Sequence, residues 1–436
     1  MNKVVRKTFH LFLFALFFKT QLSFAQRSNS KAYIADLKAI TDIMVYDVTS
    51  PVAAARYYAY STLASYETLA LQERDKHPSF FDFFQRPLKN PFPLNAQLEN
   101  KAAAYRYALL FTALKLLPSG KKLIPRIEFL KQELEKEEVL FIEEIAQTIV
   151  EYANQDGFLQ LNNLKRYTPK RGPAFWQPTK PAYMAPVEPN WNSLTPLFLK
   201  SADQFLTKPP VKYDLNPTSD FYKLLLEVKE VTDEDDKEKN EIAAFWDCNP
   251  YAISQIGHLE FGLKKISPGG HWMGIAGIAV RKARLNLNNT IFTHALLALV
   301  LHDAFIACWD EKYRSNRVRP ETVINRHIDK RWSPLLQTPP FPEYVSGHSV
   351  ASSASAEILT LIFGPNFSFR DTTEKEFGLK TRSYKSFNQA AEEACISRLY
   401  GGIHYRDAID EGIWQGKKVA SFIIAKTKAH FPYKLK

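Results

Sequence analysis

The stretch TIFTHALLALVLHDAFIACWDEKYR, residues 290–314, predicts a long helix that is apolar mostly along one side. Other helices have to cover such a side. Three of them are predicted towards the C-terminus, over Ser346–Phe363, Phe387–Tyr400 and Tyr405 to about Lys426. Gly401-Gly402 separates the last two.

The N-terminal side is helical as well. Ser50-Pro51 is typical of an N-cap with proline in the first turn, and it opens a helix that runs to about Leu71. Two further helices are predicted, one from Asn95 to about Leu117 and one, or a pair, from Arg126 to about Asn154.

Residues 167–196 are rich in Pro, Trp and Asn and have little periodicity. We expect an ordered loop around the helices, because exposed linkers rarely carry tryptophans such as Trp176 and Trp191. Few segments alternate with period two, so the predicted class is all-α, as two packed four-helix bundles with long connecting loops. The predicted parts are a signal peptide (1–25), an N-terminal helical part (26–180) and a C-terminal catalytic part (181–436), or one continuous unit after the signal.

The first residues predict export. Lys3, Arg6 and Lys7 precede an apolar run, Leu11–Phe18, that is too short to span a bilayer. Ser23-Phe24-Ala25 offers small residues at the spacing of a signal-peptidase site. We therefore expect a periplasmic or secreted protein that begins near Gln26 and has no membrane span in its mature chain.

Composition excludes several classes of protein. The three cysteines, Cys248, Cys308 and Cys395, form no disulfide framework, and no CxxC or CxxCH motif suggests zinc, iron–sulfur or attached haem. His294 and His302 lie outside any HExxH motif, which disfavours a zinc enzyme. The formal net charge of +11 suits the steering of anions, but no basic block interleaved with aromatics predicts nucleic-acid binding.

The first of three segments with candidate chemistry is KYRSNRVRP, residues 312–320. Seven residues at about 100° each bring Lys312 and Arg319 to nearly the same side of a helix. Pro320 sets a boundary, so Arg319 is expected where that helix ends. Two solvated cations on a surface helix are the alternative.

The second segment is FPEYVSGHS, residues 341–349, which leads into an apolar helix. Ser346 is a good N-cap and Gly347 lets the backbone approach a ligand. Free N–H groups at such a helix end favour an anion, and His348 could exchange protons with it. An ordinary capped helix is the alternative.

The third segment is SRLYGGIHYRD, residues 397–407. Arg398 ends one helix and His404 begins the next, so one ring nitrogen of His404 can face a bound group. A satisfied core histidine is the alternative. Three cations, a hydroxyl, a glycine amide and two histidines together match what a tetrahedral, multiply charged oxyanion requires, since charge-assisted hydrogen bonds contribute roughly 1.5–3 kcal/mol each.

The pattern Lys-x6-Arg-Pro, Ser-Gly-His and Ser-Arg-x5-His resembles that of the vanadium-dependent haloperoxidases, which share this pocket with bacterial acid phosphatases and type 2 phosphatidic acid phosphatases. The resemblance covers Asp303 to His404 and continues weakly through residues 245–251 and 267–272. It implies a vanadate cofactor, with His404 as the vanadium ligand, His348 as the acid–base residue and Lys312 as the catalytic residue that polarises the peroxide by hydrogen bonding. It also implies that the vanadate oxygens are held by Lys312, Arg319, Ser346, Gly347 and Arg398.

Two positions depart from the family pattern. Val345 replaces the usual proline before Ser-Gly-His. Ala408 stands where many members have an aspartate four residues after the final histidine, with Asp407 and Asp410 nearby. The partner that orients His404 is therefore left open.

Trp309, one turn before Lys312, and Phe341 match by resemblance the positions that line the halide side of haloperoxidase pockets, with Tyr251 as a third. Three ordinary core aromatics are the alternative. The resemblance implies hydrogen peroxide and a halide as substrates and a hypohalous acid as product, with iodide preferred and bromide as a second halide. An exported acid phosphatase with a phosphohistidine intermediate at His404 is one alternative. A non-catalytic scaffold is the other. Oligomeric state and any organic acceptor stay open.

Overall fold

The computed structural model describes residues 28–88, 92, 97–256, 259–262, 264–431 and 433. The predicted signal peptide lies outside these residues. Most of the described chain is helical, and the only strands within it form two antiparallel pairs. The prediction of an all-α fold is confirmed.

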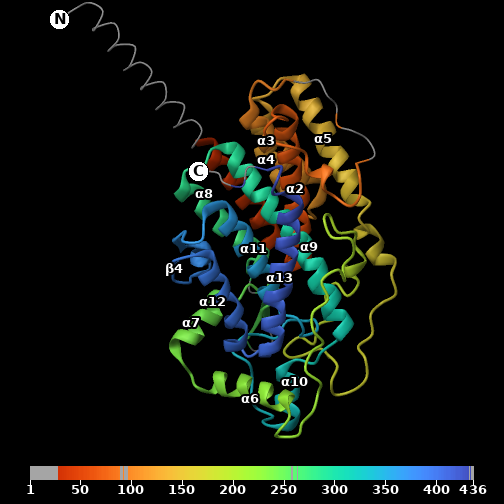
Figure 1. The fold of residues 1–436 in the computed structure, drawn as a ribbon, viewed down its shortest axis with the longest axis vertical. Coiled ribbons are helices and arrows are strands. Elements are labelled where there is room, and N and C mark those ends of the chain that lie inside the picture. Colours follow the sequence, from red (N-terminus) through yellow and green to blue (C-terminus); the bar gives the residue numbers. More distant parts are fainter. Residues whose placement is uncertain are drawn as a thin grey trace, which may run out of the picture.

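The helices form two groups that share α9 (Leu287–Ser315). One group, at one end of the molecule, comprises α2 (Pro51–Gln72), α3 (Lys101–Leu116), α4 (Ile124–Lys131) and α5 (Lys136–Asn154) (Figure 1). The other comprises α8 (Pro268–Ala283), α11 (Gly347–Phe363), α12 (Phe387–Tyr400) and α13 (Arg406–Thr427). The shorter helices α6 (Asp220–Asp233) and α10 (Pro320–His327) lie at the opposite end, and α7 (Lys237–Phe245) packs on α12.

Helix α9 is the core of the fold. Every residue from Thr290 to Tyr313 is buried, so the helix is covered on all sides and not only along its apolar face. Among the described residues it alone is long and apolar enough to cross a membrane, but that stretch is completely buried inside the protein. The helix is therefore the core helix of a bundle.

Local capping explains where most helices begin. Ser50 Oγ accepts a hydrogen bond from Ala53 N (3.2 Å) at the start of α2, as its sequence predicts. The prediction that α3 starts at Asn95 was wrong, because Asn100 caps it and accepts from Ala103 N (3.2 Å). The region 126–154 is two helices, since the capping box of Glu135 and Glu138 starts α5 anew.

The end of α9 also differs from its prediction. Asn316 adopts a left-handed conformation (φ 54°) and ends the helix at Ser315. Arg319 is extended and is the N-cap residue of α10. The spacing of Lys312 and Arg319 had suggested that they share one helix, but they do not. A turn after Ser315 separates them.

The segments between the helices contribute buried side chains and two short strand pairs. Residues 167–196 lack long helices, and Trp176 and Trp191 are buried, as expected. The strand pairs are β1 (Ile253–Ile256) with β2 (Leu259–Gly262) and β3 (Phe369–Asp371) with β4 (Arg382–Tyr384). One hydrophobic cluster extends from Tyr33 to Tyr433, and the division near residue 180 stays a prediction.

Candidate active site

The three motif segments meet at one place. Lys312 lies in the last turn of α9, Arg319 caps α10, and Ser346 and Gly347 start α11. Arg398 lies in the last turn of α12, and His404 follows it in the turn before α13. Gly347, His348, Arg398 and His404 line one cavity. Arg319 Nη1 lies 3.2 Å from His404 Nε2, and Lys312 Cε lies 3.9 Å from where a Cβ on Gly347 would be. We call these six residues, with Ser346, the cradle.

The cations of the cradle bind backbone carbonyls. Lys312 Nζ donates to the carbonyl oxygens of Pro342 and Glu343, both at 3.1 Å, and to that of Val345 at 2.5 Å. Arg319 donates to Phe341 O (3.0 Å) and Ile403 O (2.8 Å). Carbonyl dipoles orient these cations without neutralising their charge.

Several polar atoms of the cradle have no partner. Arg319 Nη2, Arg398 Nε and His348 Nε2 are buried and make no hydrogen bond. Within the described part of the chain, no carboxylate pairs with Lys312, Arg319 or Arg398. Burying unpaired cations and N–H groups is unfavourable, so the cavity is built for an anion. A tetrahedral oxyanion such as vanadate fits this donor set.

Burial determines the protonation of the cradle. It lowers the pKa of Lys312 to about 7 and that of Arg319 to about 10. It also holds the pKa values of His348 and His404 well below the usual range, with help from neighbouring cations, chiefly Arg398 for His348 and Arg319 for His404. Both histidines are therefore neutral near pH 7 and can offer a lone pair.

Glu343 orients His404, a role that the sequence did not reveal. His404 Nδ1 lies 2.8 Å from Glu343 Oε1, which also accepts from Tyr405 N (3.1 Å). A carboxylate there favours the proton on Nδ1. Nε2 then carries the lone pair, which accepts a hydrogen bond from Arg319 Nη1 (3.2 Å), and the ring of His404 lines the cavity. The available signal was a single acidic residue within the FPEYVSGHS motif.

Asp407 precedes Ala408, the position where many family members have an aspartate, and it pairs with an arginine. Asp407 accepts from Arg317 Nη1, at 2.7 Å to each carboxylate oxygen, and Arg317 Nε lies 3.5 Å from Glu343 Oε2. Burial raises the pKa of Glu343 to about 7, against the opposing effect of Arg317. Asp407 thus supports the arginine behind Glu343 and does not contact His404 directly.

The predicted halide residues line the same cavity. Trp309 and Phe341 have ring centroids 5.0 Å apart, and Lys312 Nζ lies 5.1 Å from the Phe341 ring centroid. Tyr251 also lines this cavity, as do Gly347, His348, Arg398, His404 and Cys248. The cavity is therefore lined by aromatic rings together with Arg398 and two histidines.

A larger cavity, of about 690 Å³, lies elsewhere, between the first helix (residues 28–46), α8 and η5 (Thr373–Phe377). It contains Lys38, Arg281 and Glu376 but none of the motif residues. The larger cavity is therefore not the one at the motif residues. Buried charge without a counterion identifies the functional site better than cavity volume does.

Comparison with known proteins gives the family. A model described as the VCPO second helical-bundle domain matches residues 292–432. A crystal structure described as the first bacterial vanadium-dependent iodoperoxidase is 42% identical, with a TM-score of 0.83, over 92% of this chain and 96% of its own. None of the curated proteins matches.

Two further solved structures share the fold. A holo-type bacterial vanadium-dependent chloroperoxidase has a TM-score of 0.66 at 15% identity, over 88% of this chain and 93% of its own. The apo-type chloroperoxidase has a TM-score of 0.65 at 16% identity, over 88% and 95%. With the cradle in place and 42% identity to the iodoperoxidase along nearly the whole chain, the protein belongs to the vanadium-dependent haloperoxidase family.

Proposed function

We propose that the protein is an exported vanadate-dependent haloperoxidase that oxidises iodide with hydrogen peroxide to hypoiodous acid. The observation that carries the proposal is the buried cradle, in which Lys312, Arg319 and Arg398 have no carboxylate partner among the described residues. Its likeness to a bacterial iodoperoxidase supports iodide as the halide.

The cradle residues would divide the binding of vanadate. Lys312, Arg319 and Arg398 supply charge, Ser346 its hydroxyl, Gly347 a free amide at the helix start, and His404 Nε2 the lone pair for vanadium. Bound vanadate supplies a Lewis acid that activates peroxide for two-electron oxidation of a halide. A Cβ at position 347 would lie 3.6 Å from Trp309 Cζ3 and 3.9 Å from Lys312 Cε, so glycine keeps this side of the cavity open.

His348 is the base in this proposal. Its Nε2 is buried and has no partner, and its low pKa keeps the ring neutral, so Nε2 can accept a proton from hydrogen peroxide. Lys312 donates its three hydrogen bonds to carbonyls, and therefore acts on the cavity through its charge.

The halide would approach from the aromatic side. Trp309 and Phe341 present apolar rings, which suit a large, weakly hydrated anion such as iodide better than the polar end of a phosphate ester. Iodide is also the halide most easily oxidised. Bromide is the second halide that we test.

The first experiment uses purified mature protein freed of phosphate and loaded with orthovanadate. We expect vanadate-dependent triiodide formation from iodide and peroxide, with slower oxidation of bromide. The metal-free protein is assayed with a phosphomonoester in parallel. Hydrolysis of the ester together with no triiodide would replace the proposal by the phosphatase alternative.

Export is tested separately. The mature protein, recovered from the medium or periplasm, should begin near Gln26. A full-length N-terminus in the cytoplasmic fraction would contradict the predicted signal peptide.

His348→Ala should separate binding from turnover. The variant removes a neutral base but none of the cradle's cations, so we expect vanadate affinity within a few-fold of wild type and a kcat lower by roughly 10²–10⁴-fold. Calorimetry with orthovanadate and initial rates of triiodide formation measure the two quantities. Unchanged kcat would remove His348 from its proposed role.

Anion affinity should fall above about pH 7. Lys312 has a pKa of about 7 without an anion, and a bound anion raises it, so binding at higher pH requires uptake of a proton. The affinity should then fall by up to about tenfold per pH unit between about pH 7 and 9. Tungstate, whose own charge is constant there, is titrated calorimetrically at several pH values. Lys312→Met should bind weakly and with a shallower slope, because only the ionisation of Glu343, whose pKa is also about 7, then remains. A flat wild-type profile would contradict the assignment.

A further inference from the structure

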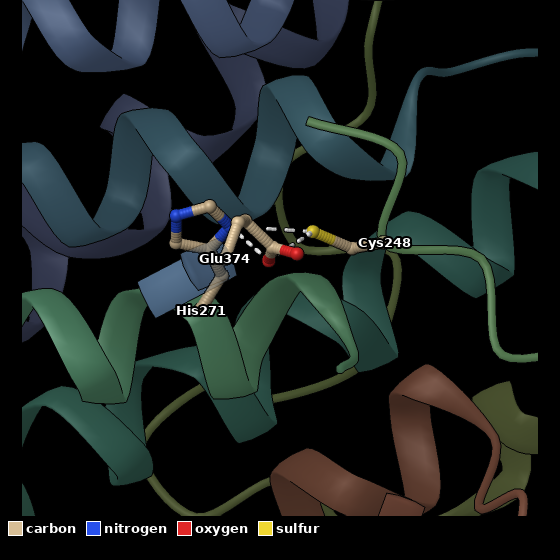
Figure 2. A group of neighbouring side chains, drawn as sticks. All are labelled: Cys248, His271 and Glu374. Atoms are coloured by element: carbon tan, nitrogen blue, oxygen red, sulfur yellow. Dashed lines mark hydrogen bonds and ion pairs between the residues drawn. The ribbon is translucent and has the colours of Figure 1, made fainter. Parts of the chain in front are cut away.

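A second group of buried reactive side chains lies next to the cradle. Cys248 follows α7, His271 lies in α8, and Glu374 lies in η5, and Figure 2 shows the three turned towards one another. Cys248 Sγ is 3.4 Å from His271 Nδ1, His271 Nδ1 is 3.2 Å from Glu374 Oε1, and Cys248 Sγ is 4.0 Å from Glu374 Oε1. Three potential ligand atoms thus surround one point.

We propose that Cys248 Sγ, His271 Nδ1 and Glu374 Oε1 bind a zinc ion. Thiolate, imidazole and carboxylate are the ligands that zinc prefers. With its usual bond lengths, tetrahedral zinc separates such ligand atoms by roughly 3.3–3.6 Å. Two of the three observed separations lie within about 0.2 Å of that range, and the third needs only a small movement of the thiol or the carboxylate.

Asp371 orients His271 so that Nδ1 can bind a metal. Its Oδ2 lies 2.8 Å from His271 Nε2, while its Oδ1 accepts from Thr373 N (2.9 Å) and Thr373 Oγ1 (2.7 Å). A carboxylate held on one ring nitrogen keeps the proton there and leaves the other nitrogen free for a metal. Histidine ligands of metals almost always donate their other ring N–H to a carboxylate, a backbone carbonyl or a water.

Burial supports a cation between the three atoms. His271, Cys248 and Glu374 are each at most 3% exposed, so water does not screen their lone pairs from one another. A zinc ion balances a thiolate and a carboxylate there. The alternative is a metal-free network in which protons on the thiol and the imidazole separate the same atoms.

The zinc ion would stiffen the chain that supports the cradle. The Trp246 ring stacks on His271 with centroids 4.5 Å apart, and the Trp246 carbonyl accepts from Arg398 Nη1 (2.8 Å). Cys248 itself lines the cavity of the cradle. With three protein ligands and a water in its fourth position, the proposed ion would hold the segment on which Arg398 rests.

No short motif marks this site. Cys248 lies 23 residues before His271 and 126 residues before Glu374. Sequence patterns such as CxxC or HExxH, whose absence disfavoured zinc, detect only ligands that are close along the chain. The fold brings these three together.

The test measures metal in the mature protein, purified without chelator and without vanadate. We expect about one zinc ion per chain by mass spectrometry of the metal content, and less than about a tenth of that in Cys248→Ser. Cobalt exchanged for zinc should give a thiolate-to-cobalt charge-transfer band in the near ultraviolet. Cys395→Ser, which changes another buried free thiol, is the matched control and should retain zinc.

Glu374→Gln provides a second variant in case Cys248→Ser fails to fold. It should keep the charge-transfer band but bind cobalt at least about tenfold more weakly. A wild-type protein with little zinc and no such band, or equal zinc in the wild type and Cys248→Ser, would overturn the proposal in favour of the metal-free network. Neither readout depends on vanadate, so the result is independent of the proposed haloperoxidase activity.

Discussion

His404→Ala is expected to abolish vanadate binding while the protein stays folded. Glu343 holds the proton of His404 on Nδ1, so Nε2, which accepts from Arg319, carries the lone pair that would bind vanadium, and alanine leaves no such ligand. The loss of affinity should exceed the roughly 10–100-fold that changes to the partners of a metal ligand cost. Calorimetric titration with orthovanadate and vanadium NMR of the bound ion measure it.

The controls for this variant separate binding from folding. His327 is an exposed histidine on α10, and His327→Ala should bind vanadate as the wild type does. Thermal unfolding without vanadate should be similar in the two variants. Wild-type vanadate affinity in His404→Ala would remove this residue from the proposed site, whatever the halide activity.

The motif residues of the cradle could be predicted from sequence because each segment carries its own local geometry. Ser346 caps a helix whose start places Gly347, and the glycine pair after Arg398 turns the chain to His404. The spacing of Lys312 and Arg319 led to a wrong prediction of one helix carrying both, because a left-handed residue, Asn316, ends the helix between them. The role of these two residues in binding an anion stays a prediction.

Contacts between residues far apart in the chain could not be predicted from the sequence. Glu343 and His404 are 61 residues apart, and no periodicity or spacing connects them. Ala408 drew attention to its neighbours Asp407 and Asp410, but the fold turns Asp407 to Arg317 and supplies the carboxylate for His404 from another loop. The partner of His404 is thus a residue distant in the chain.

Glu343→Gln should lower vanadate affinity by roughly 10–100-fold, the cost typical of removing a partner of a metal ligand. The amide has nearly the same shape, but it lacks the charge that makes His404 a stronger donor at Nε2 and that balances Arg317. We therefore expect weaker binding and a shifted vanadium resonance for the fraction still bound. Orthovanadate titration and vanadium NMR measure both effects.

Asp407→Asn is the matched control, because it makes the same chemical change to the other carboxylate on Arg317 without touching His404. If the network only stabilises the fold, both variants should lower the melting temperature and leave the vanadium resonance unchanged. If Glu343 positions His404, only Glu343→Gln should shift the resonance and weaken vanadate binding, because only its carboxylate holds the proton on Nδ1.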